Sequence, residues 1–371
     1  MAFCTAFSGV FLHVKGGSTV ICQNGRVIFE IEDLPFVEQH GVVEATRLVL
    51  ERREKTNFPL FFSTHQLADF LAVSHKDLLF VAKHPQRFYK EIHLPKKGGG
   101  LRVIHAPFGL MKTLQYAVWR EILQRESPSP YATAYLPHSQ VRENALPHKG
   151  KDYLLKMDLA DFFGSISYRK VLSTLFPSTL FPKKVGWILT NLCCYNGAVP
   201  QGAPTSPALS NLVMKQFDKT LGEFCAKRGV TYTRYCDDLT FSANRPLYDV
   251  FQRATELLQS HGFRVNPKKV VFLHKGQHME VTGLTVNQKT TVPKAYKRAL
   301  RQEVFYAATY GLTNSKKKQE TQTIHSYYQQ LKGKLHYVLH IEPQNQWFRE
   351  WEGRLTTTYQ KELEGKVIKS S

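Results

Sequence analysis

Residues Tyr232–Ser242 read YTRYCDDLTFS, which places two adjacent carboxylates between two runs rich in β-branched and aromatic residues. Such runs favour strands, so the segment predicts a β-hairpin with Asp237 and Asp238 at its tip. Adjacent carboxylates repel each other, and a fold keeps them together at a cost unless a cation lies between them and another ligand. The pair therefore predicts a third acid close to it in the fold.

A third carboxylate follows a short apolar run upstream. Leu154–Met157 reads as a buried strand that ends in Asp158. Pro200–Pro207, a turn-rich segment, lies between the two acidic stretches. On neighbouring strands, Asp158 and Asp237 could hold two Mg²⁺ ions, which activate an attacking hydroxyl and stabilise the leaving pyrophosphate of a nucleotide. The pattern therefore predicts nucleotidyl transfer, the chemistry of a polymerase.

The composition favours a polyanionic partner. The 371 residues include 50 Lys and Arg against 30 Asp and Glu, a formal net charge of +20. A site that gathers acids and metal needs a basic surround to hold a phosphate backbone, so nucleic acid is the expected partner.

No apolar run reaches membrane-spanning length and the first residues lack a signal-peptide pattern, which predicts a cytoplasmic protein without membrane contact. The six cysteines show neither a Cys-x-x-Cys pair nor zinc spacing, so we expect free thiols, no disulfide and no zinc.

The three stretches, in this order, resemble the palm motifs of reverse transcriptases, whose signature Tyr-x-Asp-Asp box is here Tyr235–Asp238. Two further segments resemble features that distinguish the retron reverse transcriptases. Asn144–His148 matches Asn-Ala-x-x-His just before the first palm motif, and Val281–Gly283 matches a Val-Thr-Gly triplet after the hairpin. The resemblance implies an α+β right-hand polymerase fold of fingers, palm and thumb, with a catalytic β-hairpin in the palm and a helical thumb.

The resemblance also implies a division of the chain. We expect the fingers at residues 61–142, the palm with the catalytic motifs at 143–292 and a basic helical thumb at 293–371. Residues 1–60 read as three strands and a helix from about 42 to 55, and they hold six basic and seven acidic side chains. We interpret this near-neutral N-terminal extension as a segment that contacts protein.

The resemblance assigns the catalytic roles to the acids. Asp158 and Asp237 would ligate two Mg²⁺ ions, Asp238 would support the pair, and the backbone carbonyl of Leu159 would complete one coordination shell. Phe163 lies where the family places its steric gate, a flat ring that would clash with a ribose 2′-hydroxyl and so select deoxynucleotides. The alternative is that Phe163 is a core phenylalanine.

Further residues are expected at the deoxynucleoside triphosphate. A predicted hairpin, Tyr89–Pro95 and Leu101–Pro107, has a glycine-rich tip that can approach phosphates closely. The expected nucleotide-binding residues are Arg102, Phe163, Gln201, Gly202 and Lys268. The sequence leaves open whether Lys268 or Lys269 contacts the triphosphate, and solvated side chains remain the alternative for Arg102 and for both lysines.

Two groups of residues are expected to recognise RNA. Polar side chains can read a 2′-hydroxyl or an unpaired base edge, whereas cationic ones mostly contact phosphate. The first group comprises Asn144, His148, Val281, Thr282 and Gly283, with turn, cap and bulge roles as the structural alternative. The second group lies on the predicted thumb and comprises Lys294, Lys297, Arg298 and Arg301.

The resemblance implies an RNA-directed DNA polymerase that recognises its cognate structured non-coding RNA and makes a branched, RNA-linked single-stranded DNA, called msDNA. Family members prime from a guanosine 2′-hydroxyl and commonly serve in anti-phage defence with a separate effector protein. The segment after the thumb motifs is too short for an RNase H domain, so we expect a host RNase H to remove the template. Two alternatives are another bacterial reverse transcriptase class, such as a group II intron type, and an RNA-binding scaffold of a defence complex with incidental polymerase activity. The oligomeric state stays open.

Overall fold

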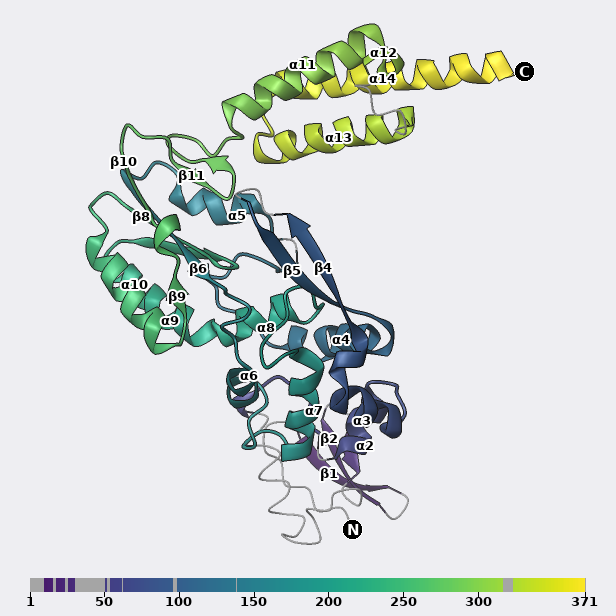
Figure 1. The fold of residues 1–371 in the computed structure, drawn as a ribbon, viewed down its shortest axis with the longest axis vertical. Coiled ribbons are helices and arrows are strands. Elements are labelled where there is room, and N and C mark those ends of the chain that lie inside the picture. The colour runs from purple at the N-terminus through teal and green to yellow at the C-terminus, as the bar shows by residue number, and fades with distance from the viewer. Residues whose placement is uncertain are drawn as a thin grey trace. The chain divides into compact units, whose positions relative to one another are not determined.

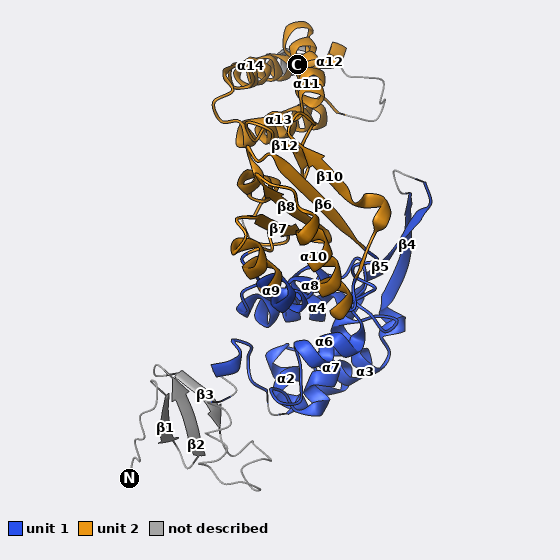
Figure 2. Cartoon of the chain, turned by 90° about the vertical axis from the view of Figure 1, so that its left-hand side faces the viewer, with its two compact units in different colours: residues 1–130, 160–219, 261–263 blue, residues 131–159, 220–260, 264–371 orange. Residues whose placement is uncertain are grey.

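The computed structural model describes residues 10–15, 18–23, 26–30, 51, 54–61, 63–95, 99–137, 139–315 and 323–370, of which 10–30 and 365–370 are described by their backbone alone. The fold mixes helices with small antiparallel sheets (Figure 1), so the expected α+β class is confirmed. The chain divides into two compact units (Figure 2), of which unit 1 comprises Met1–Pro130, Ala160–Lys219 and His261–Phe263, and unit 2 comprises Tyr131–Leu159, Thr220–Ser260 and Arg264–Ser371.

The central sheet of unit 2 has the strand order β10-β6-β8-β7, with β9 also paired to β6. These strands are β6 Tyr153–Ala160, β7 Thr231–Tyr235, β8 Asp238–Ala243, β9 Arg264–Val265 and β10 Val271–His274. The predicted hairpin is confirmed as β7 and β8, and the predicted apolar strand as β6. The hairpin pairs Thr231 with Ser242 and Tyr235 with Asp238, so the two aspartates lie at its turn.

One face of this sheet is core. Leu155 and Met157 on β6 and Leu239 and Phe241 on β8 alternate along their strands and are at most 1% exposed. The helix after β8, α10 Tyr248–Ser260, buries Val250, Ala254, Leu257 and Leu258, which recur at helical spacing. Burial of this apolar face fixes the register of the strands, because a shift by one residue would turn every core side chain outward.

The C-terminal part of unit 2 begins with a small hairpin, β11 Glu280–Val281 and β12 Leu284–Thr285. Its two turn residues, Thr282 and Gly283, both have positive φ angles, as a two-residue hairpin turn requires. The helices α11 Lys294–Tyr310, α12 Leu312–Ser315, α13 Ile324–Ile341 and α14 Gln346–Ser370 follow and pack on one another (Figure 1). Leu300, Leu331 and Phe348 belong to their shared core, which continues into Leu154 and Val281.

Unit 1 carries a long two-stranded hairpin and a group of helices. The hairpin pairs β4 Tyr89–Pro95 with β5 Leu101–Pro107, as predicted. The helices are α2 Thr64–Phe70, α3 His75–Lys83, α4 Gly109–Glu121, α6 Tyr168–Thr174, α7 Lys183–Cys193 and α8 Ser206–Val213, with the short 3₁₀ segments η2 Pro85–Phe88 and η3 Leu123–Arg125. Helix α9 Lys215–Ala226 begins in unit 1 and ends in unit 2.

Near the N-terminus, β1 Val10–Lys15, β2 Ser18–Gln23 and β3 Arg26–Glu30 form an antiparallel sheet, which confirms the three predicted strands. Most of the helix predicted at 42–55, and residues 316–322 of the predicted helical thumb, lie outside the described residues. Within the described part of the chain, no helix combines the length and the hydropathy needed to cross a membrane. Cys193, Cys194, Cys225 and Cys236 are buried free thiols.

Candidate active site

The three predicted catalytic aspartates lie together at one end of the unit 2 sheet. Asp158 on β6 is the cross-strand partner of Asp238 on β8, and Asp237 occupies the adjoining turn. The backbone N–H of Leu159 donates to the carbonyl of Asp237 at 3.0 Å, which ties the turn to β6. Because directly opposed residues of an antiparallel pair lie on the same face, the side chains of Asp158 and Asp238 are neighbours.

A cation already balances part of this negative charge. Nζ of Lys269 lies 2.7 Å from Oδ2 of Asp158, and the hydrogen bond with Asp158 raises the pKa of Lys269. Asn266 caps the 3₁₀ turn Pro267–Lys269 by accepting from the N–H of Lys268, and its backbone N–H donates to the carbonyl of Asp158 at 2.8 Å. Lys269 is therefore the lysine whose side chain reaches the aspartates, while the described contact of Lys268 is made by its backbone.

Burial and crowding change the acidity of the site. Burial, then the charges of Asp237 and Asp158, raise the pKa of Asp238 to about 6. A carboxyl held among like charges gains from a bound cation, so these residues fit a divalent metal. Among the described residues, no group of three or more His, Cys, Asp or Glu side chains is arranged to hold a metal ion without other ligands. Mg²⁺ usually takes one or two carboxylates together with substrate phosphates and water, so an incomplete set is what a nucleotide-dependent site needs.

Two further side chains, neither of them predicted from the sequence, contact the turn that carries Asp237. Arg234 is fully buried, and its guanidinium donates to the carbonyl of Cys236 at 3.0 Å. The hydroxyl of Tyr135 lies 3.2 Å from Sγ of Cys236. The alternation of side chains along the strand could have predicted the burial of Arg234. Arg234 lies on the same face of the strand as Tyr232, and that face points into the core.

The other expected nucleotide-binding residues belong to unit 1. Arg102 is exposed on β5, opposite Leu94. The carbonyl of Gln201 accepts from the backbone N–H of His105 at 2.9 Å, which attaches the turn-rich segment to the same strand. Gly202 has φ of +124°, and a Cβ there would lie 2.6 Å from Ile104 Cγ2. Glycine is thus required at this position, both by its conformation and by the close approach of β5.

Phe163 is half-buried in unit 1, with its ring centroid 5.3 Å from that of Phe162. Phe162 is buried and packs in turn on Phe263 at 5.8 Å. One part of the Phe163 ring is therefore supported by the core while another part stays accessible. This is compatible with a rigid surface that a sugar could meet.

His148 lies in the interior and not on a surface. It is 1% exposed, at the end of the 3₁₀ turn η4 Leu146–His148. Its Nδ1 lies 2.7 Å from Oγ of Ser242 on β8, and its Nε2 lies 2.8 Å from Oγ1 of Thr233 on β7. Burial lowers the pKa of His148 to about 3, so the ring stays neutral and bridges both strands of the β7–β8 hairpin.

Asn144, in helix α5 Val141–Ala145, is also buried and joins two distant segments. Its Oδ1 accepts from the hydroxyl of Thr133 at 2.7 Å, and its Nδ2 donates to Oγ1 of Thr282 at 3.4 Å. Val281 is fully buried, whereas Gly283 is exposed in the β11–β12 turn. The burial of Asn144, His148 and Val281 favours the structural alternative over direct contact with RNA, because a buried side chain offers no hydrogen-bonding surface to a ligand.

Comparison with known proteins agrees with these motifs. The family described as "Reverse transcriptase (RNA-dependent DNA polymerase)" matches residues 94–286. The Retron Ec86 reverse transcriptase of Escherichia coli is 33% identical over 64% of this chain and 75% of its own length. The chain belongs to the retron reverse transcriptases. The Retron Mx162 reverse transcriptase of Myxococcus xanthus is 30% identical over 79% of this chain and 67% of its own length. The Retron Ec83 reverse transcriptase of Escherichia coli is 32% identical over 61% of this chain and 78% of its own length. The family resemblance drawn from the palm and retron motifs is thereby confirmed.

Helix α11 of this retron reverse transcriptase, in the segment predicted as the thumb, presents basic side chains. Lys294, Arg298 and Arg301 are exposed, and the guanidinium of Arg301 lies 5.4 Å from the ring centroid of Trp347. Lys297 differs from them, because its Nζ forms an ion pair with Glu342 at 2.7 Å and is mostly buried. Three of the four predicted thumb residues are therefore available to a ligand, and the fourth joins α11 to the end of α13.

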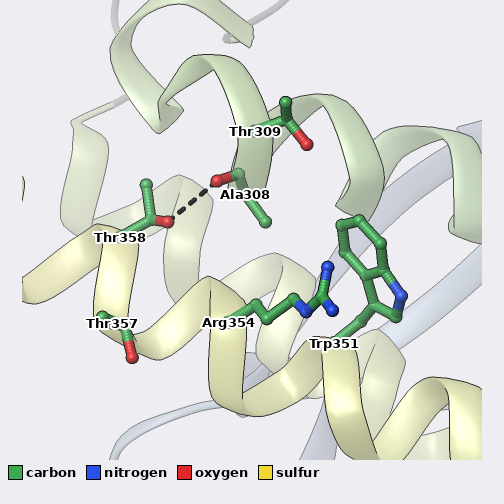
Figure 3. A pocket seen from close by; sticks show the side chains of 6 residues that line it. All are labelled: Ala308, Thr309, Trp351, Arg354, Thr357 and Thr358. Carbon is green, nitrogen blue, oxygen red and sulfur yellow. Dashed lines mark hydrogen bonds between the residues drawn. The ribbon is translucent and has the colours of Figure 1, made fainter.

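A hollow of about 330 Å³ opens between α11 and α14 of the same enzyme (Figure 3). Thr358 donates to the carbonyl of Ala308 at 2.9 Å at one side of the hollow. On the other side, the guanidinium of Arg354 lies 4.7 Å from the ring centroid of Trp351, which also packs on Phe305. The hollow thus combines an aromatic face, a cation and hydroxyl groups.

The crowded carboxylates predict a cost in stability that one substitution removes. Because the pKa of folded Asp238 lies above its ordinary value, the ionised carboxylate disfavours folding above about pH 6. We expect Asp238→Asn to raise the Tm of the enzyme in EDTA at pH 8 by about 2 °C, as relief of buried repulsion commonly does. The difference should shrink as the pH is lowered from 6 toward 4. Thermal scans without divalent metal check this, and an unchanged or lower Tm at pH 8 would contradict it.

Proposed function

We propose that this enzyme, an RNA-directed DNA polymerase that synthesises msDNA, performs two-metal nucleotidyl transfer at the end of strands β6 and β8. The observation that carries the proposal is the pairing of Asp158 with Asp238 across the two strands, with Asp237 in the turn between β7 and β8. Asp158 and Asp237 would hold two Mg²⁺ ions, with the carbonyl of Leu159 completing one shell. Bound Mg²⁺ supplies an activated 3′-hydroxyl and charge stabilisation for the departing pyrophosphate.

The protein side chains have separate tasks in this reaction. Asp158 and Asp237 orient the reacting groups by fixing where cations are held, and Asp238 keeps the local charge negative. Lys269 is the better candidate for neutralising the triphosphate than Lys268, because its ammonium group already lies among the aspartates. Binding of metal to Asp158 would release Lys269 from its ion pair and leave its charge for phosphate.

Selection of the nucleotide is assigned to unit 1 on the family resemblance. Arg102 would pair with the triphosphate, Gln201 and Gly202 would line the nucleotide pocket, and Phe163 would reject a 2′-hydroxyl. The contacts within unit 1 support this assignment, since Gln201 and Gly202 pack on the strand that carries Arg102. We accordingly interpret residues 61–142 as fingers, 143–292 as palm and 293–371 as thumb of a right-hand polymerase.

The thumb is proposed to bind the structured RNA. Residues from Lys294 onward contain fourteen basic and seven acidic side chains, which favours contact with a phosphate backbone. The hollow between α11 and α14 would take an unpaired base, which would extend the stack that Trp351 forms with Trp347 at 5.1 Å. Arg354 would exchange its ion pair with Glu350 for the adjacent phosphate. Asn144, His148 and Thr282 would instead stabilise the palm from within.

Loss of the stacking face should weaken binding of the RNA. We expect Trp351→Ala to raise the Kd for the cognate RNA about tenfold, since stacking contributes roughly 1–3 kcal/mol per base. Extension of a short annealed primer on an unrelated RNA should change little. Trp187→Ala, a change at a similarly half-exposed tryptophan on α7, is the matched control for loss of aromatic surface. Equal affinity losses in the two variants, measured by filter binding, would contradict a specific role for the hollow.

The biological setting is also a proposal. The cognate RNA would supply the priming guanosine 2′-hydroxyl, so that the DNA product stays linked to RNA through a branch. Host RNase H would remove the copied template, and the assembly would act in anti-phage defence with a separate effector protein, which residues 1–60 are proposed to contact. These partners follow from the retron resemblance.

A purified-protein assay tests the proposed reaction. The enzyme with Mg²⁺ and the four deoxynucleotides should extend a DNA primer annealed to an RNA template. With its own RNA and no added primer, it should produce DNA that remains attached to RNA on a denaturing gel until a debranching enzyme is added. Extension of the annealed primer without attached product on the cognate RNA would confine the enzyme to ordinary priming. No extension on either substrate would refute the proposed function.

A further inference from the structure

We propose that Arg234 and Tyr135 are positioning residues that hold the Cys236–Asp237 turn in the conformation needed for metal binding by Asp237. This inference rests on the proposed two-metal function of Asp158 and Asp237. Neither side chain is assigned a contact with nucleotide or metal. Each acts on Cys236, the residue between Tyr235 and the catalytic pair.

The turn has an unfavourable backbone conformation. Cys236 has φ of +61°, in the left-handed region, which residues other than Gly, Asn and Asp seldom adopt. Such a conformation persists only where the surrounding structure determines it strongly, and it concentrates at functional sites. The carboxylate that the conformation directs is the one immediately after it, Asp237.

Arg234 provides the first restraint. Its side chain is 0% exposed, although a guanidinium is costly to bury unless its donors find acceptors. One of these donors is directed to the carbonyl of Cys236, two residues further along the chain, at 3.0 Å. The backbone of Arg234 is fixed as well, because its N–H donates to the carbonyl of Tyr131 at 2.7 Å and its carbonyl accepts from the N–H of Thr133 at 2.8 Å. The guanidinium therefore reaches the turn from a rigid base.

Tyr135 provides the second restraint, from the segment before α5. Its hydroxyl donates to Sγ of Cys236 at 3.2 Å, while the residue as a whole is 49% exposed. Tyr135 itself has φ of +63°, so a second strained residue is aimed at the first. With the N–H of Leu159 on the carbonyl of Asp237, three contacts from three segments determine the turn.

The tyrosine contact gives the cleaner test, because removing the hydroxyl of a half-exposed side chain should not affect folding. Tyr135→Phe and Cys236→Ala each delete one side of the contact. We expect each to lower kcat about fivefold and to raise the Kd for Mn²⁺, measured by electron paramagnetic resonance without nucleotide, about threefold. The double variant should be no worse than the more impaired single variant, because one contact is lost in all three. Tyr168→Phe, which loses a comparable contact with Nδ2 of Asn191 at 3.1 Å, should leave kcat and Mn²⁺ affinity unchanged.

Substitution of Arg234 also tests whether the Cys236–Asp237 turn is held in place, and it should change kcat more. Arg234→Met should lower kcat more than Tyr135→Phe does, and Arg234→Lys should restore part of the loss because it keeps a donor and the charge. If Arg234→Met fails to fold, the tyrosine series alone decides the matter. Wild-type kcat and Mn²⁺ affinity in both Tyr135→Phe and Cys236→Ala would overturn the proposal, as would additive losses in the double variant. Asp237→Asn is measured in parallel. Unchanged Mn²⁺ affinity in this variant would refute the proposed metal assignment itself. Unchanged Mn²⁺ affinity in the Tyr135 variants, with a loss in Asp237→Asn, would refute only the positioning role.

Discussion

Asp237→Asn should lower the rate of DNA synthesis by about 10³-fold or more while leaving the affinity for RNA within about twofold of wild type. The substitution keeps the size of the side chain but removes the negative charge that a divalent cation needs. It does not touch the exposed cations of α11, so binding of RNA should persist. Single-turnover extension of an annealed primer, together with filter binding of the cognate RNA, measures the two quantities separately.

Asp158→Asn should behave in the same way, because Asp158 and Asp237 are assigned equivalent tasks. Asp249→Asn is a suitable control, since it neutralises another aspartate of unit 2 whose partner is Arg245 at 2.9 Å on an exposed surface. That variant should extend primers at the wild-type rate. Near-normal synthesis by Asp237→Asn or Asp158→Asn would show that the carboxylates on β6 and at the hairpin turn are not metal ligands.

Phe163→Ala is expected to admit ribonucleotides, with discrimination against them reduced by about 10²-fold. The ring is supported from behind by Phe162, so it cannot easily yield to an added hydroxyl. Alanine would remove the obstacle without adding a polar group. Competition between a ribonucleotide and the matching deoxynucleotide at a single template position gives the ratio of the two kcat/KM values directly.

Phe163→Tyr supplies the matched variant, because it keeps a flat ring and should keep the discrimination. A fall in thermal stability of Phe163→Ala without any change in discrimination would assign Phe163 to the core. Equal loss of discrimination in both variants would show that the shape of the ring is not the selecting feature.

The catalytic strands could be predicted from the sequence because their signals are local. Short runs of β-branched and aromatic residues flank Asp237 and Asp238, and the apolar run before Asp158 has the length of a buried strand. Helices α11 and α13 were predictable for the same reason, since their apolar residues recur at helical spacing. Each element carries its own pattern, and the three carboxylates indicated that the strand ending in Asp158 lies beside the hairpin.

Other features depend on contacts between distant segments, which no local pattern encodes. Lys268 and Lys269 are equivalent in sequence, and only the 3₁₀ turn after Asn266 decides which one reaches Asp158. Asn144 and His148 are polar residues of a loop-like segment, yet they are buried because β7, β8 and the β11–β12 turn surround them with hydroxyl partners. The sequence indicated that these residues matter, but it did not reveal that they lie in the interior of unit 2.

The stoichiometry of metal binding tests the central claim most directly. The complex for this test contains the enzyme, an RNA template, a dideoxy-terminated DNA primer and the next deoxynucleotide. It should take up two Mn²⁺ ions per enzyme molecule, as counted by electron paramagnetic resonance after the Mn²⁺ bound to free nucleotide is subtracted. The double variant carrying Asp158→Asn and Asp237→Asn should lose both ions from this count. Two tightly bound ions in the double variant, or none in the wild-type complex, would contradict the assignment of Asp158 and Asp237 as the metal ligands of DNA synthesis.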